Sequence, residues 1–230
     1  MIEVFIGYSC CPLTAAAFES VPGVRATTCD LLPSRGWHRH LQCDVWEGYY
    51  SRRWDGALFH PMCTVLTVSG AWAFNDPDYA RYPGVGYHQR VKPGTLTGEA
   101  RRAQREIELD NFRRLLALDI PCGIENPAKS FINKAIRSPD QVIHPNWFGD
   151  DASKETGLWL TNGMPLLESK REDQVPPRWV DGKPRWSNQT DSGQNKLTPG
   201  DDRWLLRSQT YPGIAKAIGT QWGRWLSERV

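Results

Sequence analysis

The chain has 230 residues, of which 40% are hydrophobic and 23% are charged, and its formal net charge is +2. This length and composition predict one soluble domain with a sizeable core. The small net charge gives no chain-wide signal for nucleic acid, although a local basic patch would suffice for binding. No run approaches the roughly 18 apolar residues that span a bilayer, and the N-terminus indicates a strand instead of a signal peptide. We therefore expect no membrane partner and a cytoplasmic location.

The six cysteines are not spaced as metal ligands. Cys10 and Cys11 are adjacent, and there is neither a Cys-x-x-Cys pair nor a histidine at a matching distance. We therefore expect no metal. Cys29, Cys43 and Cys122 lie in or beside predicted strands, where they are expected to be buried as small hydrophobic residues.

Strands and helices are predicted to alternate along the chain. The predicted strands are 3–8, 24–30, 40–45, 56–59, 120–125, 141–144 and 158–161, and the predicted helices are 13–20, 97–118, 128–136 and 211–226. This order favours an α/β fold with a doubly wound, mostly parallel sheet and helices on both faces. A long loop is expected at 77–94. We divide the chain into an α/β domain (1–167), an irregular extended arm (168–202) and a segment (203–230) whose final helix packs back on the core.

One cysteine, Cys63, follows a predicted buried strand that stops at His60 and Pro61. Ligands of open α/β sheets bind outside the carboxyl ends of the strands, and a thiolate at such a place adds readily to electron-poor carbons. Cys63 is therefore a candidate nucleophile. The alternative is a buried cysteine that packs a turn.

A second strand end has the same form, because the predicted strand 120–125 ends at Glu125 and Pro127 follows. A glutamate beside apolar residues is costly to bury unless it is paired. Such a group could have a raised pKa and act as a general acid. The alternative is a solvent-facing carboxylate that caps the next helix. We expect Cys63 and Glu125 to meet in one crevice.

Two acidic residues, Asp30 and Asp44, close the second and third predicted strands. An acidic residue at the end of the second strand of a doubly wound sheet commonly accepts hydrogen bonds from a ribose. The alternative for each is a turn or helix-capping aspartate. The turn after the first strand is not glycine-rich, since it contains Gly7 alone and Pro12, which has no N–H.

Taken together these residues resemble the cytosine-C5 DNA methyltransferase family, and more closely its short phage and bacterial methyltransferase-like members, which lack a full target-recognition domain. The resemblance covers nearly the whole chain in the family's order. The segments that carry it are Asp30-Leu31, Asp44-Val45, His60-Pro61-Met62-Cys63, Glu125-Asn126-Pro127, Phe148-Gly149 with Lys154, and the tail segments 192–196 and 207–215.

The resemblance implies a Rossmann-like methyltransferase fold, S-adenosylmethionine as cofactor, and DNA or a pyrimidine nucleotide as substrate, in the host cytoplasm for a phage protein. Cys63 would attack C6 of a cytosine, Glu125 would hydrogen-bond or protonate N3, and Asn126 would fix the turn. Lys154 would lie near the target base, which a duplex would have to flip out. The tail would fold back to complete the cofactor site. The cofactor residues implied are Tyr8, Ser9, Asp30, Leu31, Asp44, Val45 and Pro61.

Three features depart from the family pattern. The turn after the first strand lacks the family's glycines, Met62 replaces the second proline before the nucleophile, and the segment after Leu158 is too short for a usual target-recognition domain. A second hypothesis follows, in which the chain is a retired methyltransferase that binds a nucleotide, nucleic acid or a host protein. C5 chemistry with a different one-carbon donor is a third.

Overall fold

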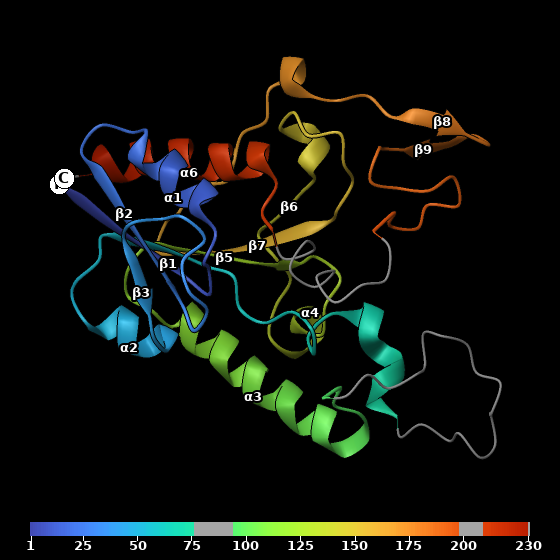
Figure 1. Cartoon of the computed structure of the whole chain (residues 1–230), viewed down its shortest axis with the longest axis horizontal. Helices are drawn as coiled ribbons and strands as arrows, with labels where there is room; N and C mark the ends of the chain where they lie inside the picture. Colours follow the sequence, from blue (N-terminus) through green and yellow to red (C-terminus); the bar gives the residue numbers. More distant parts are fainter. Residues whose placement is uncertain (76–93, 198–208, 230) are drawn as a thin grey trace.

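A seven-stranded, mostly parallel β-sheet forms the centre of the computed structural model, which describes residues 1–75, 94–197 and 209–229 (Figure 1). The strands are β1 (Ile2–Gly7), β2 (Val24–Asp30), β3 (His40–Gln42), β4 (Gly56–Phe59), β5 (Cys122–Pro127), β6 (Gln141–Ile143) and β7 (Thr156–Thr161). Their order is β3-β2-β1-β4-β5-β7-β6. β7 runs antiparallel to both of its neighbours, and the other neighbouring strands pair in parallel.

Helices cover both faces of this sheet (Figure 1). One face carries α1 (Pro12–Glu19) and α6 (Pro212–Ser227), and the other carries α2 (Val45–Tyr50), α3 (Gly98–Leu116) and the short α4 (Ile132–Ala135). Short 3-10 helices lie at Val68–Phe74, Pro145–Trp147 and Arg171–Asp173, and β8 (Arg178–Val180) pairs with β9 (Lys183–Arg185) in a separate hairpin. No helix within the described ranges is long and apolar enough to cross a bilayer.

The hydrophobic core is divided into two layers by the sheet. Val4 and Ile6 of β1 face the α1 and α6 side, where they join the fully buried Trp222, whereas Phe5 faces the α2 and α3 side and joins Phe112. This alternation is the two-residue period of a strand. Because β1 is buried on both faces, its residues are almost all apolar, as expected for a central parallel strand.

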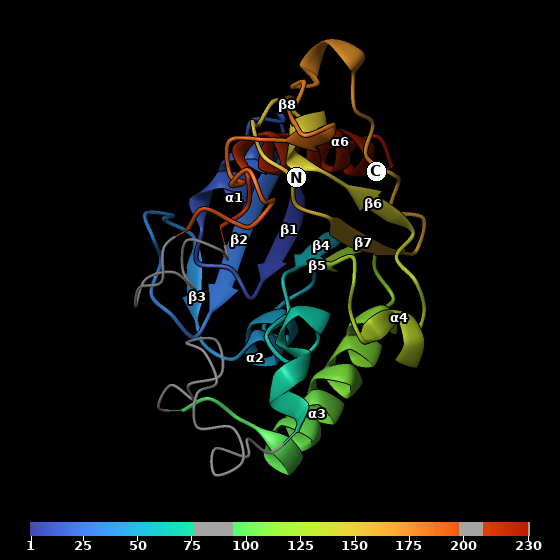
Figure 2. The ribbon, with the colours of Figure 1, turned by 90° about the vertical axis from the view of Figure 1, so that its right-hand side faces the viewer.

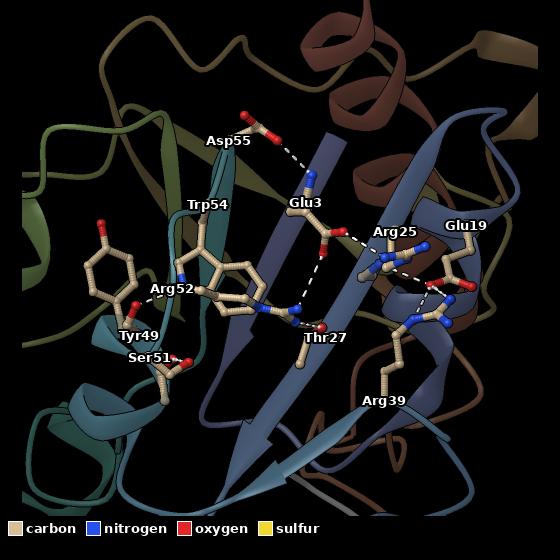
Figure 3. A network of polar contacts seen from close by, with 12 residues as sticks. Glu3, Glu19, Arg25, Thr27, Arg39, Tyr49, Ser51, Arg52, Trp54 and Asp55 are labelled. Atoms are coloured by element: carbon tan, nitrogen blue, oxygen red, sulfur yellow. Dashed lines mark hydrogen bonds and ion pairs between the residues drawn. The ribbon is translucent and has the colours of Figure 1, made fainter. Parts of the chain in front are cut away.

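A polar network ties together the beginnings of the strands, at the edge where β1 and β2 start (Figure 3). The Glu3 carboxylate contacts Arg25 at 3.1 Å and Arg52 at 3.8 Å, and the Glu3 backbone N–H donates to the Asp55 carboxylate over 2.7 Å. These contacts join β1, β2 and the entry to β4. They lie at the opposite end of the sheet from the carboxyl ends of the same strands, where ligands of open α/β sheets bind.

The predicted fold class, a doubly wound α/β sheet with helices on both faces, is confirmed, and three predicted elements need correction. The strand expected at 40–45 ends at Gln42, because Asp44 begins α2. The helix expected at 128–136 is reduced to α4. The arm expected to be irregular contains the β8–β9 hairpin, which projects from the sheet in Figure 1. The long loop predicted at 77–94 lies almost wholly outside the described residues.

Candidate functional site

Cys63 lies just past the carboxyl end of β4, on an anchored turn. The Cys63 carbonyl accepts hydrogen bonds from the backbone N–H groups of Leu66 at 3.1 Å and Thr67 at 2.9 Å, and Leu66 is fully buried. The Cys63 residue itself is exposed. The alternative of a buried cysteine that packs a turn is therefore wrong.

A buried arginine, Arg101, holds the backbone beside Cys63. Its guanidinium comes from α3 and donates to the Thr64 carbonyl over 2.6 Å, while it lies 5.0 Å from the centre of the Phe74 ring. Burial lowers the pKa of Arg101. Sequence analysis did not single out this arginine, because nothing local in the sequence links it to the turn after β4.

Glu125 is brought to the same edge because β5 pairs in parallel with β4. Phe59 is in register with Ile124, so the residues that follow, His60 and Glu125, lie side by side. The buried Asn126 strengthens this connection, since its side-chain amide donates to the Pro61 carbonyl over 3.1 Å. The structure therefore places the ends of β4 and β5, which carry Cys63 and Glu125, next to each other.

The charge of Glu125 differs from the prediction. Burial raises its pKa, but the positive charge of Lys154, 3.9 Å from one carboxylate oxygen, and the hydrogen bond with His60, 3.1 Å from the other, outweigh burial and lower the pKa to about 2. The expected raised pKa is wrong, because the ammonium group of Lys154 and the hydrogen bond with His60 stabilise the charged carboxylate. Glu125 is an ionised carboxylate at neutral pH.

A small pocket opens beside this carboxylate. It is lined by Glu125, Lys154, Thr156, Gln209, Thr210, Tyr211 and Ile214. The catalytic residues expected from the sequence, Glu125 and Lys154, thus share one cavity with the C-terminal tail. The tail was expected to complete a cofactor site, and its described part lines the pocket next to Glu125.

The tail is held in place by the loop after the helix Pro145–Trp147. The Gly213 N–H donates to the Asp150 carboxylate over 2.9 Å, and a Cβ atom at position 213 would collide with the Phe148 carbonyl oxygen. Asn188 of the arm forms two hydrogen bonds with the backbone of Ser153, which precedes Lys154 in this loop. Its amide nitrogen donates to the Ser153 carbonyl over 2.9 Å, and its amide oxygen accepts from the Ser153 N–H over 3.0 Å. Three segments were expected to act near the base and cofactor: Phe148-Gly149, 192–196 and 207–215. Phe148-Gly149 and the described part of 207–215 meet at Gly213.

The Gly213→Ala substitution tests this packing. We expect the free energy of unfolding to fall by about 1 to 3 kcal/mol, because an added methyl group in a well-packed contact forces the backbone to shift. Urea unfolding measures the change. Lys216→Ala, an exposed position on the same helix, is the matched control and should change stability by less than about 0.5 kcal/mol. Equal stability of Gly213→Ala and the wild type would contradict the close approach.

The expected cofactor residues surround the carboxyl end of β1, where the strand order reverses between β1 and β4. Such a topological switch point is where ligands of open α/β sheets bind. Ser9 is buried there, and its N–H donates to the Cys29 carbonyl over 3.0 Å. Asp30 ends β2, and one of its carboxylate oxygens accepts from the Leu32 N–H at 2.9 Å. Leu31 is 72% exposed at the same edge.

The remaining cofactor candidates have structural roles. Asp44 caps α2 by accepting from the N–H groups of Trp46 and Glu47, which is the helix-capping alternative. Val45 and Pro61 are buried. The Tyr8 hydroxyl is bonded to the Asn111 side chain at 2.9 to 3.0 Å, and burial raises the Tyr8 pKa to about 12.

The fold and the site define the class of the protein as α/β with a doubly wound sheet, in which an exposed thiol, a buried carboxylate and an acidic strand end share one edge. Among the described residues, no group of three or more histidine, cysteine, aspartate or glutamate side chains could hold a metal ion. No family model matches the chain, and no curated protein is significantly similar to it.

Proposed function

We propose that the protein is an S-adenosylmethionine-dependent methyltransferase of the cytosine-C5 type, which acts on DNA or a pyrimidine nucleotide through a covalent adduct with Cys63. The observation that carries this proposal is the joint placement of Cys63 and Glu125 at adjacent ends of β4 and β5. The Asn126–Pro61 hydrogen bond fixes that placement. A nucleophile and a proton-handling group on neighbouring rigid elements are what addition to a pyrimidine ring requires.

The sheet topology supports the proposal. A seven-stranded sheet in the order β3-β2-β1-β4-β5-β7-β6, with β7 reversed, is the arrangement expected of the methyltransferase fold that the sequence resembles. The residues at the switch point also fit the nucleoside part of the cofactor. One oxygen of Asp30 accepts a backbone hydrogen bond, and an ionised carboxylate has further lone pairs with which to accept from ribose hydroxyls.

In this reaction Cys63, Glu125 and Lys154 each have a distinct chemical role. The Cys63 thiolate adds to C6 of the pyrimidine, which makes C5 electron-rich. Glu125 receives the edge of the base that carries N3 and the exocyclic group, while Lys154 keeps this carboxylate ionised before the base enters. Bound S-adenosylmethionine supplies an electrophilic methyl group. Removal of the C5 proton and elimination of the thiolate then release Cys63.

The Asp30→Ala substitution tests cofactor binding. Calorimetry of the wild type should show S-adenosylmethionine binding in the micromolar range, and loss of a charge-assisted hydrogen bond should weaken it by about 10- to 100-fold. Asp110→Ala, which removes an exposed carboxylate on the distant α3, is the matched control and should bind as the wild type does. The absence of heat from the wild type at high concentration would exclude autonomous cofactor-dependent methylation.

A second function, a retired methyltransferase fold that binds a nucleotide, nucleic acid or a host protein, is favoured by the turn after β1. Tyr8 adopts a φ of 57°, which glycine usually supplies in such a turn, and its side chain is tied to Asn111. Pro12 is the first residue of α1, so the helix presents one N–H fewer to a ligand. Ligand binding without methyl transfer, and without any effect of Cys63→Ala, would select this function.

A further inference from the structure

Two cysteines that the proposed reaction does not use, Cys29 and Cys43, lie in contact beside the carboxyl end of β2. Their sulfur atoms are 3.9 Å apart. Cys29 belongs to β2 and is fully buried, and Cys43 is half-buried in the link between β3 and α2. Sequence analysis expected both as buried hydrophobic residues and did not pair them, because the contact depends on how β3 packs beside β2.

The parallel pairing of β2 with β3 creates this contact. Cys29 lies opposite Leu41, and Cys43, two residues further along, packs into the same hydrophobic layer as Cys29. The Cys29 thiol also contacts the backbone that leads into α2, since its sulfur is 3.7 Å from the Cys43 carbonyl oxygen and 3.8 Å from the Asp44 carbonyl oxygen. The sheet itself therefore brings the two thiols together.

Gly48 of α2 leaves the space that both sulfur atoms occupy. A Cβ atom at position 48 would lie 2.6 Å from the Cys29 sulfur and 3.4 Å from the Cys43 sulfur. Glycine is less favourable than alanine inside a helix, so its presence here has a packing reason. The two thiols supply that reason, and at 3.9 Å no other atom fits between them.

The two thiols differ in how easily an oxidant reaches them. Burial and, to a smaller extent, the neighbouring Cys43 raise the pKa of Cys29 to about 12, so Cys29 remains a thiol at neutral pH. Cys43 is half-buried and is therefore the thiol that a small reagent meets first. A disulfide has an S–S distance of about 2.05 Å, so the two sulfur atoms must approach by about 2 Å. Most of this movement falls to Cys43, because it lies outside the regular strands, whereas Cys29 is in a strand that is paired on both sides.

We propose that Cys29 and Cys43 form a redox modification site, at which hydrogen peroxide converts the two thiols into a reversible disulfide. The Cys43 sulfur attacks the peroxide first, so that an S–O bond forms, the O–O bond breaks and one water leaves with the thiol proton. The Cys29 sulfur then attacks the Cys43 sulfur, the S–O bond breaks, and the oxygen leaves as a second water with the Cys29 proton. The two thiols together lose two electrons and two protons, which reduce one hydrogen peroxide to two waters. Exchange with an added thiol restores both cysteines.

The disulfide acts on the edge of the sheet where the cofactor is proposed to bind. Asp30 follows Cys29, and Asp44 follows Cys43 and caps α2. Closing the S–S bond draws the Cys43-Asp44 segment towards the end of β2 and narrows the space beside Asp30. This consequence rests on the proposed function, in which Asp30 accepts hydrogen bonds from the ribose of S-adenosylmethionine. Oxidation should therefore weaken binding of the cofactor.

Peptide mapping of the peroxide-treated wild type tests the modification site. Trypsin cleaves after Arg25, Arg35, Arg39 and Arg52, so Cys29 and Cys43 fall alone in the separate peptides 26–35 and 40–52. Without reduction, mass spectrometry should find these peptides joined, with the summed mass less two hydrogen atoms, and dithiothreitol should separate them. Cys43→Ala should yield no joined pair, with Cys43→Ser in its place if the alanine variant does not fold. Cys63→Ala, which removes the exposed thiol, is the control and should still yield the pair.

Calorimetry with S-adenosylmethionine tests the consequence for the cofactor. We expect the oxidised wild type to bind at least about 10-fold more weakly than the reduced protein, with full recovery after dithiothreitol, and Cys43→Ala to bind equally before and after peroxide. The absence of the joined peptides would overturn the modification site. Joined peptides with unchanged affinity would overturn its effect on the cofactor. A reduced wild type that binds no S-adenosylmethionine would overturn the proposed function instead, and the peptide map would still decide the modification site.

Discussion

The Cys63→Ala variant is expected to lose methyl transfer by at least about 1,000-fold, because the covalent route through C6 disappears with the thiol. The loss is measured with labelled S-adenosylmethionine and a cytosine-containing oligonucleotide. An oligonucleotide with 5-fluorocytosine gives a second measurement. Release of the enzyme requires loss of the C5 hydrogen as a proton, and fluorine at C5 cannot be lost in this way. The wild type should therefore remain covalently attached to the strand in denaturing gel electrophoresis, and Cys63→Ala should not.

The same substitution should leave the fold unchanged. Cys63 is exposed, so its replacement by alanine should alter the free energy of unfolding by no more than about 0.5 kcal/mol. Cys43→Ala, a cysteine away from the nucleophile, is the matched control and should keep both adduct formation and methyl transfer. Adduct formation by Cys63→Ala at the wild-type rate would show that Cys63 is not the nucleophile. This conclusion holds whether or not the cofactor binds.

The strand ends were accessible to prediction because their signals are local. Short apolar runs that stop at Pro61 and Pro127 mark buried strands, and parallel strands of one sheet present their carboxyl ends at one edge. The proximity of the two strand ends that carry Cys63 and Glu125 follows from these two rules once β4 and β5 are neighbours. The neighbour relation itself comes from tertiary packing, and no local pattern specifies it.

The ionisation of Glu125 could not be predicted in the same way. Its pKa depends on His60, which is 65 residues away in sequence, and on Lys154 in the loop before β7. A glutamate after an apolar strand is equally compatible with desolvation that raises the pKa and with ion pairing that lowers it. Only the positions of the partners decide between these effects. Arg101 was missed for the same reason, since its contact with Thr64 is nonlocal.

The error at Asp44 is of a different kind, because the signal was present in the sequence. Asp44 and Glu47 have the spacing of a helix-capping box, in which the first side chain accepts from backbone N–H groups of the first turn. The apolar Val45 after a predicted strand favoured a longer strand instead. A capping signal outweighs one further apolar residue, since the side chain satisfies N–H groups that the helix itself leaves unpaired.

The Glu125→Gln variant should lower the rate of methyl transfer by about 100- to 10,000-fold, the range over which a positioned proton-transfer group contributes. Glutamine keeps the shape of the side chain and its hydrogen bond with His60 in one orientation, but it cannot pass a proton to N3. The same labelled-methyl assay measures the loss. Glu155→Gln, which removes a carboxylate paired with Lys129 at 2.9 Å, is the matched control and should retain the wild-type rate.

The variant also has a defined effect on stability against pH. A carboxyl group whose pKa falls from 4.5 in the unfolded chain to about 2 in the folded protein stabilises the fold at neutral pH, and this contribution is lost as the pH falls between those values. Urea unfolding at several pH values should therefore show a wild type that is more stable than Glu125→Gln above pH 4.5, with the difference shrinking towards pH 2. A difference that is constant over this range would mean that Glu125 is not held as a carboxylate in the folded protein.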